Sequence, residues 1–328
     1  MYEAFFGLES RPFDLTPDPR YLFLTPSHRE ALSNLEYGIS ARTGVTVLVG
    51  EAGTGKTTLI RATLDARDQA KTKTIYMNNP TLTRSEFLEF MAAEFQLPSH
   101  AADSKTRLLR ELEEALLQML NADITPALII DEAHSLPHEL LEEIRLLANI
   151  DTPKVKLLPI ILAGQPELAA RLNHQSLRQL KQRVELRCDL RPLDLGETGA
   201  YITARVKVAG GQAPSLFTRE AVMMIHERSN GIPRVISVIC HNSLINSFAQ
   251  GRKPVTTECV LEVCRDFDLT KSVAGEADTG ARRPETILTL GGEETRPSRM
   301  PDVVPPRIRQ RDMIGEILKP KRWYSFFE

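Results

Sequence analysis

Residues 50–57 read Gly-Glu-Ala-Gly-Thr-Gly-Lys-Thr and decide the fold. They match the pattern G-x-x-x-x-G-K-[ST], follow the apolar run 45–49 and precede a predicted helix at 56–67. Glycines let the backbone curl so that successive N–H groups face an anion, and a helix N-terminus adds partial positive charge. The stretch predicts a phosphate-binding loop; the alternative is a plain glycine turn. The candidate binding residues are Gly50, Glu51, Ala52, Gly53, Thr54, Gly55, Lys56, Thr57 and Thr58.

A second apolar run, 127–130, ends in Asp131 and Glu132. With a phosphate loop upstream, this pair predicts the other groups that ATP hydrolysis needs. Asp131, together with the Thr57 hydroxyl, would hold Mg²⁺, and Glu132 would deprotonate the attacking water. Alone the signal is weak, because any buried strand can end in an acid. His134 completes a D-E-A-H string, either supporting the site or merely starting a helix. That string also occurs in helicases, but the sequence shows no second helicase core.

Around these motifs, short apolar runs alternate with helical stretches. The predicted strands are 45–49, 74–77, 127–130, 157–163 and 184–190, and the predicted helices between them are 56–67, 83–95, 104–120, 138–149 and 166–181. Thr83 and Glu86 form a capping box. Such alternation predicts an α/β fold, a parallel five-stranded sheet sandwiched between helices.

The flanking regions differ in character. Prolines disfavour a helix before Thr25, which then caps a helix to about residue 41 with Pro26 at its first position. After Gly196 only helices are predicted, at 197–209, 218–229, 234–249 and 257–267. We therefore expect a segment 1–40, a sheet domain 41–195, an all-α lid 196–268, a disordered linker 269–311 and an amphipathic end 312–328.

Composition excludes several classes of protein. The 328 residues carry 41 Lys+Arg against 43 Asp+Glu, a net charge of −2, which gives no global reason for nucleic-acid binding. No apolar run approaches the roughly 18 residues of a membrane span. The four scattered cysteines (188, 240, 259 and 264) predict reduced core thiols in a cytoplasmic protein.

Together the phosphate loop, Asp131–His134 and Gly231-Ile-Pro-Arg234 resemble AAA+ ATPases. The N-terminal Tyr2-Glu-Ala-Phe-Phe-Gly-Leu, Pro12-Phe13, Pro17-Asp-Pro19 and His28-Arg-Glu-Ala-Leu32, with Gly164-Gln-Pro-Glu-Leu168, narrow the resemblance. Residues 1–268 look like the general secretion pathway protein A (ExeA-like) group, and most like the ATPases that accompany exosortase and exopolysaccharide systems.

This resemblance implies further site residues. Gln165 would occupy the sensor 1 position, where Asn or Thr is usual; capping the next helix is the alternative. Arg183 would be the arginine finger that reaches a neighbouring subunit's site. The alternatives are that Arg178 has this role, or that Arg183 is an ordinary surface arginine. Arg234 matches sensor 2, with a plain surface arginine as its alternative. Residues 17–24 would line the adenine pocket or simply pack as an apolar strap.

The function implied is hydrolysis of Mg-ATP that drives or switches assembly of a cell-envelope secretion or polysaccharide-export system. Partners would be copies of this chain, as an ATP-dependent homo-oligomer, and envelope membrane proteins, placing it in the cytoplasm or peripherally at the inner membrane. The fullest relatives add a membrane span and a peptidoglycan-binding module; we expect neither here.

Two other functions stay open. One is a DNA-associated ATPase of the transposition or replication type, for which the basic residues Arg171, Arg178, Lys181, Arg183 and Arg187 would form a ridge. The other is a nucleotide-binding scaffold without turnover, which the complete set Lys56, Asp131, Glu132 and Arg234 disfavours. The aromatic and basic end 312–328 would be a docking peptide, a membrane-surface anchor or a segment without a role.

Overall fold

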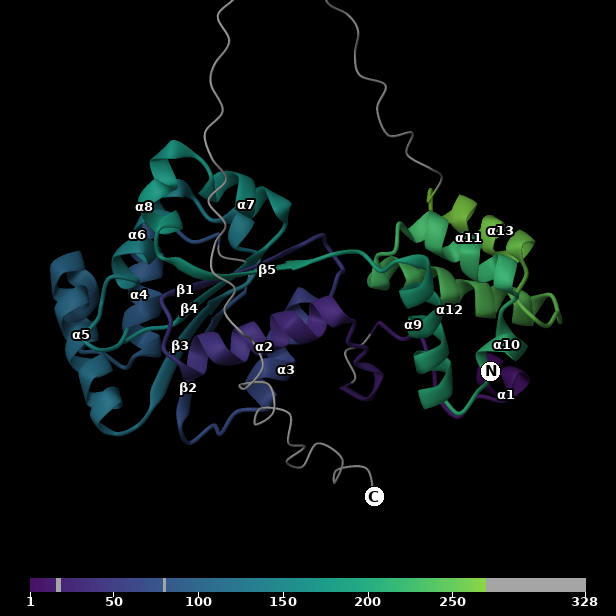
Figure 1. Cartoon of the computed structure of the whole chain (residues 1–328), viewed down its shortest axis with the longest axis horizontal. Helices are drawn as coiled ribbons and strands as arrows, with labels where there is room; N and C mark the ends of the chain where they lie inside the picture. Colours follow the sequence, from purple (N-terminus) through teal and green to yellow (C-terminus); the bar gives the residue numbers. More distant parts are fainter. Residues whose placement is uncertain (16–18, 79–80, 270–328) are drawn as a thin grey trace, which may run out of the picture. The chain divides into compact units, whose positions relative to one another are not determined.

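Five parallel strands form the central sheet: β1 (Val45–Gly50), β2 (Thr72–Met77), β3 (Thr125–Ile130), β4 (Ile160–Gly164) and β5 (Val184–Leu190). They lie in the order β2-β3-β4-β1-β5. This computed structural model describes residues 1–15, 19–78 and 81–269, all within the first of two structural units, Met1–Ala274 (Figure 1). The predicted parallel five-stranded sheet is confirmed. The predicted linker and C-terminal segment lie outside the described residues.

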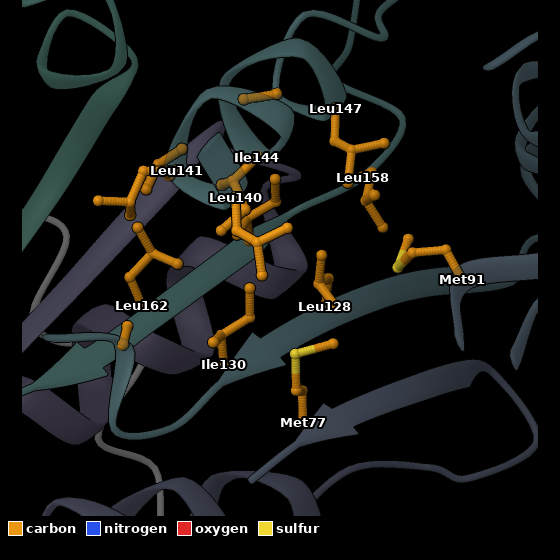
Figure 2. Close-up of a cluster of buried hydrophobic side chains, with 14 of the residues drawn as sticks. Met77, Met91, Leu128, Ile130, Leu140, Leu141, Ile144, Leu147, Leu158 and Leu162 are labelled. Atoms are coloured by element: carbon orange, nitrogen blue, oxygen red, sulfur yellow. The ribbon is translucent and has the colours of Figure 1, made fainter. Parts of the chain in front are cut away.

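Side-chain alternation along the strands explains why both faces of the sheet are covered. Leu128 and Ile130 belong to one buried core, whereas Ala127 and Ile129 belong to another. The first core contains side chains of α4 (Arg84–Glu94), α5 (Lys105–Asn121) and α6 (His138–Leu147), and Figure 2 shows leucines of α6 over β3 and β4. The second contains side chains of α2 (Pro26–Ser40) and α3 (Lys56–Asp65). The sheet is thus the middle layer of an αβα sandwich.

Two sequence-based boundaries in the sheet domain were wrong. The helix predicted over 166–181 is three pieces: α7 (Pro166–Leu172), the 3₁₀ turn η4 (Gln175–Leu177) and α8 (Arg178–Lys181). The break falls at His174, whose backbone is extended and whose Nδ1 accepts from the Ser176 N–H. The strand predicted from residue 157 starts at Ile160. Before it, residues 151–156 form a turn closed by a bridge between Asp151 and Lys156, and the Leu157 N–H donates to the Ile150 carbonyl.

An all-α part follows β5. It comprises α9 (Leu195–Val208), α10 (Ala213–Leu216), α11 (Arg219–Ser229), α12 (Pro233–Ala249) and α13 (Thr257–Asp266). Four of these were predicted; the one-turn α10 was not. Asp194 and Glu197 form a capping box that starts α9. Across the described residues no helix is long and apolar enough to cross a bilayer. The four cysteines are free and buried, as predicted.

The N-terminal residues are built into this helical part. Contrary to the expectation of no helix before Thr25, α1 (Tyr2–Phe6) forms, because the first proline is at position 12, and it ends at Gly7 in a left-handed conformation. Together with the 3₁₀ turn η1 (Pro19–Tyr21), the segment contributes apolar side chains to the core of the all-α part: Tyr2, Phe6, Leu8, Phe13 and Tyr21. Residues 1–40 therefore divide between two cores, with α2 on the sheet.

Arg205 of α9 holds this N-terminal segment in place. Its guanidinium donates hydrogen bonds to the carbonyl oxygens of Pro12 and Asp14 and lies 4.8 Å from the centroid of the Tyr21 ring. Cation–π contact and charge-assisted hydrogen bonds act together here. Thr25 caps α2 by accepting from the His28 N–H, with Pro26 at the first helical position, as predicted.

Candidate nucleotide-binding site

The loop between β1 and α3 is a tight turn closed on itself. Thr54 is fully buried, and its hydroxyl donates to the Glu51 carbonyl at 2.8 Å. Gly53 and Gly55 have φ angles of +83° and +103°, which L side chains rarely adopt. A Cβ at Gly50 would lie 2.7 Å from the Thr54 hydroxyl, so that position also admits only glycine. The local sequence therefore folds into a tight, glycine-dependent loop.

Helix α3 opens on this loop without a capping side chain. Its N-cap is Gly55, which leaves the first-turn N–H groups available to a ligand. The buried Lys56 ammonium donates to the carbonyl oxygens of Gly50, at 2.8 Å, and Glu51, at 3.1 Å. Burial lowers the pKa of Lys56, and the nearby carboxylates of Glu132 and Asp131 oppose that shift. The ammonium thus lies over the loop, where phosphate oxygens could replace the carbonyls.

Asp131 follows β3 and is buried beside the loop. Its Oδ2 accepts hydrogen bonds from the Thr57 hydroxyl at 2.7 Å and from the Tyr76 hydroxyl at 2.9 Å. Its Oδ1 accepts from the Glu132 N–H at 2.9 Å. Burial, followed by the charge of Asp131, raises the pKa of Tyr76, so the phenol stays protonated as a donor. Sequence reasoning missed Tyr76, which reaches the site from the neighbouring strand β2.

The oxygen donors at this point suit magnesium. Thr57 and Asp131 offer a hydroxyl and a carboxylate oxygen close together, the hard ligands that Mg²⁺ takes along with water and phosphate oxygens. Over the part of the chain that the structure describes, no cluster of three or more His, Cys, Asp or Glu side chains could hold a metal by itself. A metal here would need its remaining ligands from nucleotide and water.

Glu132 has a strained backbone next to Asp131. Its φ of +54° places a non-glycine residue in the left-handed region. The Ser135 N–H and hydroxyl both donate to the Glu132 carbonyl, at 2.9 and 2.8 Å, which holds the conformation. The carboxylate is 37% exposed and lies 3.3 Å from Nδ1 of His134. The carboxylate can therefore meet a water molecule while its backbone stays fixed.

His134 and Gln165 lie together behind Glu132. The Gln165 side-chain nitrogen is 3.2 Å from Nε2 of His134, and the Gln165 N–H donates to Nδ1 at 3.4 Å. Gln165 is the N-cap residue of α7, but its side chain makes no capping hydrogen bond. Gly164 permits this approach, because a Cβ there would lie 3.1 Å from the His134 nitrogen. Gln165 thus faces His134 rather than its own helix.

Arg171 of α7 fixes the 132–136 loop from behind. Its guanidinium donates to the carbonyl oxygens of His134 and, at 2.6 Å, Leu136. Arg187, also assigned to the basic ridge, donates to both oxygens of Asp189. Two of the five residues expected to form a basic ridge are therefore engaged within the chain.

Arg234 lies against the phosphate loop from the all-α part. Its N–H donates to the Gly53 carbonyl at 3.3 Å, and a Cβ at Gly53 would lie 2.7 Å from the Arg234 Cβ. Gly231 closes the turn before it: the Leu193 N–H donates to the Gly231 carbonyl at 2.8 Å, and a Cβ at Gly231 would lie 2.0 Å from the Leu193 oxygen. The start of α12 is therefore in direct contact with the phosphate loop.

The two finger candidates are not brought to this site. Arg183 directly precedes β5 and is exposed, at the amino end of a strand whose parallel neighbour β1 carries the loop at its carboxyl end. Arg178 is exposed at the start of α8. Either arginine could act only on another subunit's site. In the adenine-side segment, Tyr21 and Phe23 pack into the helical core; residues 16–18 lie outside the described residues.

The sandwich, the loop and the acidic strand end define a class of protein, the AAA+ ATPases. Residues 40–172 match the family model described as AAA domain. The fold is shared with the Aeropyrum pernix ORC2 protein in ADPNP–ADP complexes (TM-score 0.56, 17% identity, 79% of this chain and 71% of that one). It is also shared with Cdc6p from Pyrobaculum aerophilum (TM-score 0.59, 18% identity, 78% and 70%).

Within this class the chain is a homologue of general secretion pathway protein A. It is 39% identical to that protein from Aeromonas hydrophila over 294 residues, 89% of this chain. The chain spans about half the length of this relative, 52%. Drosophila ORC bound to DNA has the same fold at 19% identity, with a TM-score of 0.58 over 78% of this chain and 64% of that one.

Proposed function

We propose that the chain binds Mg-ATP at the loop 50–58 and hydrolyses it, with Glu132 as the base. The observation that carries the proposal is the convergence at one loop of four residues, each in a direct hydrogen bond with the loop or with another of the four: Lys56, Thr57, Asp131 and Arg234. A glycine turn without a ligand would need none of these contacts. A buried lysine above unpaired helix N–H groups is the arrangement that an anion stabilises.

In this mechanism each residue acts on a stated part of the substrate. The N–H groups of Gly53 and of residues 55–58, with the Lys56 ammonium, would hold the β- and γ-phosphates, whereas the Thr54 N–H donates to the Glu51 carbonyl. Magnesium, held by Thr57 and through water by Asp131, would neutralise developing charge. Glu132 takes a proton from the attacking water. Gln165, beside His134, would act as sensor 1, and Arg234, next to the loop, would act as sensor 2. Positioning and electrostatics account for most of the rate in such reactions.

The cellular role proposed here rests on the homology to general secretion pathway protein A. Hydrolysis would drive or switch assembly of a cell-envelope secretion or polysaccharide-export system, including the exosortase-associated type. The chain would act in the cytoplasm or at the inner membrane, as a homo-oligomer in which Arg183 or Arg178 completes a neighbour's site. DNA is the alternative partner.

Steady-state ATP turnover tests the proposed chemistry. We expect Glu132→Gln to retain ATP binding and to lower kcat by about 100-fold or more, the usual contribution of a general base. Lys56→Ala should lose binding as well, and removal of Mg²⁺ should abolish turnover. Lys154→Ala, on an exposed turn, is the matched control. Turnover in Glu132→Gln equal to that of the wild type would contradict the base assignment.

The same assay separates the two cellular roles. Envelope assembly predicts turnover indifferent to duplex DNA at low salt. Strong stimulation by DNA that declines with salt would replace it with the DNA-associated role.

A further inference from the structure

His28 of α2 contacts the phosphate loop, although it belongs to none of the nucleotide-binding motifs described above. Its side chain is 5% exposed, and its Nε2 lies 3.0 Å from the carbonyl oxygen of Thr54. Its Nδ1 lies 2.6 Å from the Thr25 hydroxyl. Thr25 is the N-cap of α2 and accepts from the His28 N–H. The imidazole is therefore a buried link between a helix cap and a loop carbonyl.

The partners fix which ring nitrogen carries the proton. A carbonyl oxygen only accepts, so Nε2 must be the donor to Thr54. In the neutral ring Nδ1 is then the acceptor, and the Thr25 hydroxyl donates to it. The result is a directed chain of hydrogen bonds from Thr25 through His28 to Thr54. Each group in it is buried, so losing the ring would leave the Thr54 carbonyl without a partner.

Orientation of the next peptide follows from this link. The Thr54–Gly55 peptide is trans, and in a trans peptide the carbonyl and the N–H point in opposite directions. When the Thr54 carbonyl faces His28, the Gly55 N–H faces away from it. Among the described residues, no protein group accepts from that N–H. The Gly55 φ of +103° completes the turn into α3.

We propose that His28 is a positioning residue for nucleotide binding: its Nε2–H turns the Thr54–Gly55 peptide so that the Gly55 N–H faces the bound phosphate. The proposal rests on the proposed function, since it assigns His28 to the same site. It differs from a purely structural role in a specific way. Only a side chain with a donor at the Nε2 position, whatever its other properties, can orient the peptide.

Glutamine and asparagine provide the matched pair. The glutamine amide nitrogen can reach the position of the histidine Nε2, whereas the asparagine nitrogen corresponds to Nδ1 and stops short of Thr54. We expect His28→Asn and His28→Ala to raise the Kd for a fluorescent ADP analogue about tenfold, the effect of an unsatisfied buried carbonyl. His28→Gln should stay within about threefold of the wild type.

Two measurements keep the outcome interpretable. Thermal unfolding without nucleotide identifies any variant that fails to fold. If His28→Ala fails to fold, the comparison of the Gln and Asn variants alone tests the proposal. His100→Ala, an exposed histidine remote from the loop in sequence, controls for loss of an imidazole. Equal Kd values for the Gln and Asn variants, or an unchanged Kd in all three, overturn the proposal. Wild-type binding no tighter than that of Lys56→Ala would instead overturn the proposed function itself.

Discussion

The Asp131 carboxylate is held from three directions, by Thr57, Tyr76 and the Glu132 N–H. Such preorganisation fixes both oxygens where a metal and its water shell would meet them. Asp131 and Thr57 could be predicted from sequence, because each lies in a contiguous string with its own signature. Tyr76, His28 and Arg171 could not, because their roles arise from contacts between elements distant in the chain.

Tyr76 should set the magnesium requirement. We expect Tyr76→Phe to raise the Mg²⁺ concentration for half-maximal turnover about tenfold, since hydrogen-bonding partners of metal-binding carboxylates typically contribute that much to affinity. The ring packing is preserved, so thermal stability should hardly change. A titration of turnover against Mg²⁺ at saturating ATP measures the effect. Tyr37→Phe, an exposed tyrosine on α2, is the control. An unchanged magnesium dependence would contradict this role.

His134 should act on the chemical step rather than on binding. Because it lies between Glu132 and Gln165, we expect His134→Ala to lower kcat by up to about 100-fold, the effect of a misplaced catalytic group. The Kd for ADP should stay the same. His138→Ala, at the start of α6, serves as the control. An unchanged kcat would show that His134 is a plain loop residue.

At the scale of elements, strands and long helices were predictable, but breaks and short pieces were not. The five apolar runs and the stripes of α5 and α13 carry a clear period, since each buries one face. The break at His174 and the turn α10 depend on one side-chain cap and on packing. Likewise, nothing local in residues 2–21 indicates that they complete the core of helices far along the chain. The hydrogen bond between Arg205 and Pro12, for example, joins residues 193 positions apart.

Substitutions in the two capping boxes measure how much the helix N-termini contribute to the stability of the fold. We expect Thr83→Ala and Asp194→Ala each to lower the free energy of unfolding by about 1 kcal/mol, the usual cost of losing an N-cap. The Asp194→Asn variant should retain most of the wild-type free energy of unfolding, because Asn is as good an N-cap residue as Asp. Urea unfolding measures both. Equal stability of the Asp194→Ala variant and the wild type would show that other contacts hold the start of α9.

At the scale of the molecule, the buried cysteines of the helical part report on its opening. Burial raises the pKa of the Cys259 thiol from 9.0 to about 11, and burial also raises the pKa of Cys240 and Cys264. At pH 8 the reactive thiolate of Cys259 should fall from about a tenth in the unfolded chain to about a thousandth. We expect thiol reagents to label these cysteines at least about 100-fold more slowly in the folded protein. Fast labelling without unfolding would contradict this packing.

Subunit mixing tests whether a neighbour completes the site. Arg183→Ala and Lys56→Ala should each be inactive, but an oligomer of both contains sites with an intact loop facing an intact Arg183. We therefore expect mixing to restore part of the turnover. Mixing Lys56→Ala with Arg178→Ala decides between the two arginines. Full activity of Arg183→Ala alone would exclude it as the finger.

The packing of the N-terminal residues into the core of the all-α part has a consequence for folding during translation. The Tyr2 hydroxyl contacts His241, 239 residues later, so α1 leaves the ribosome long before its binding surface exists. The sheet domain can form in the interval, but Phe6 and Phe13 stay exposed until α9 to α13 emerge. A nascent chain stalled before residue 195 should therefore be a target for chaperones.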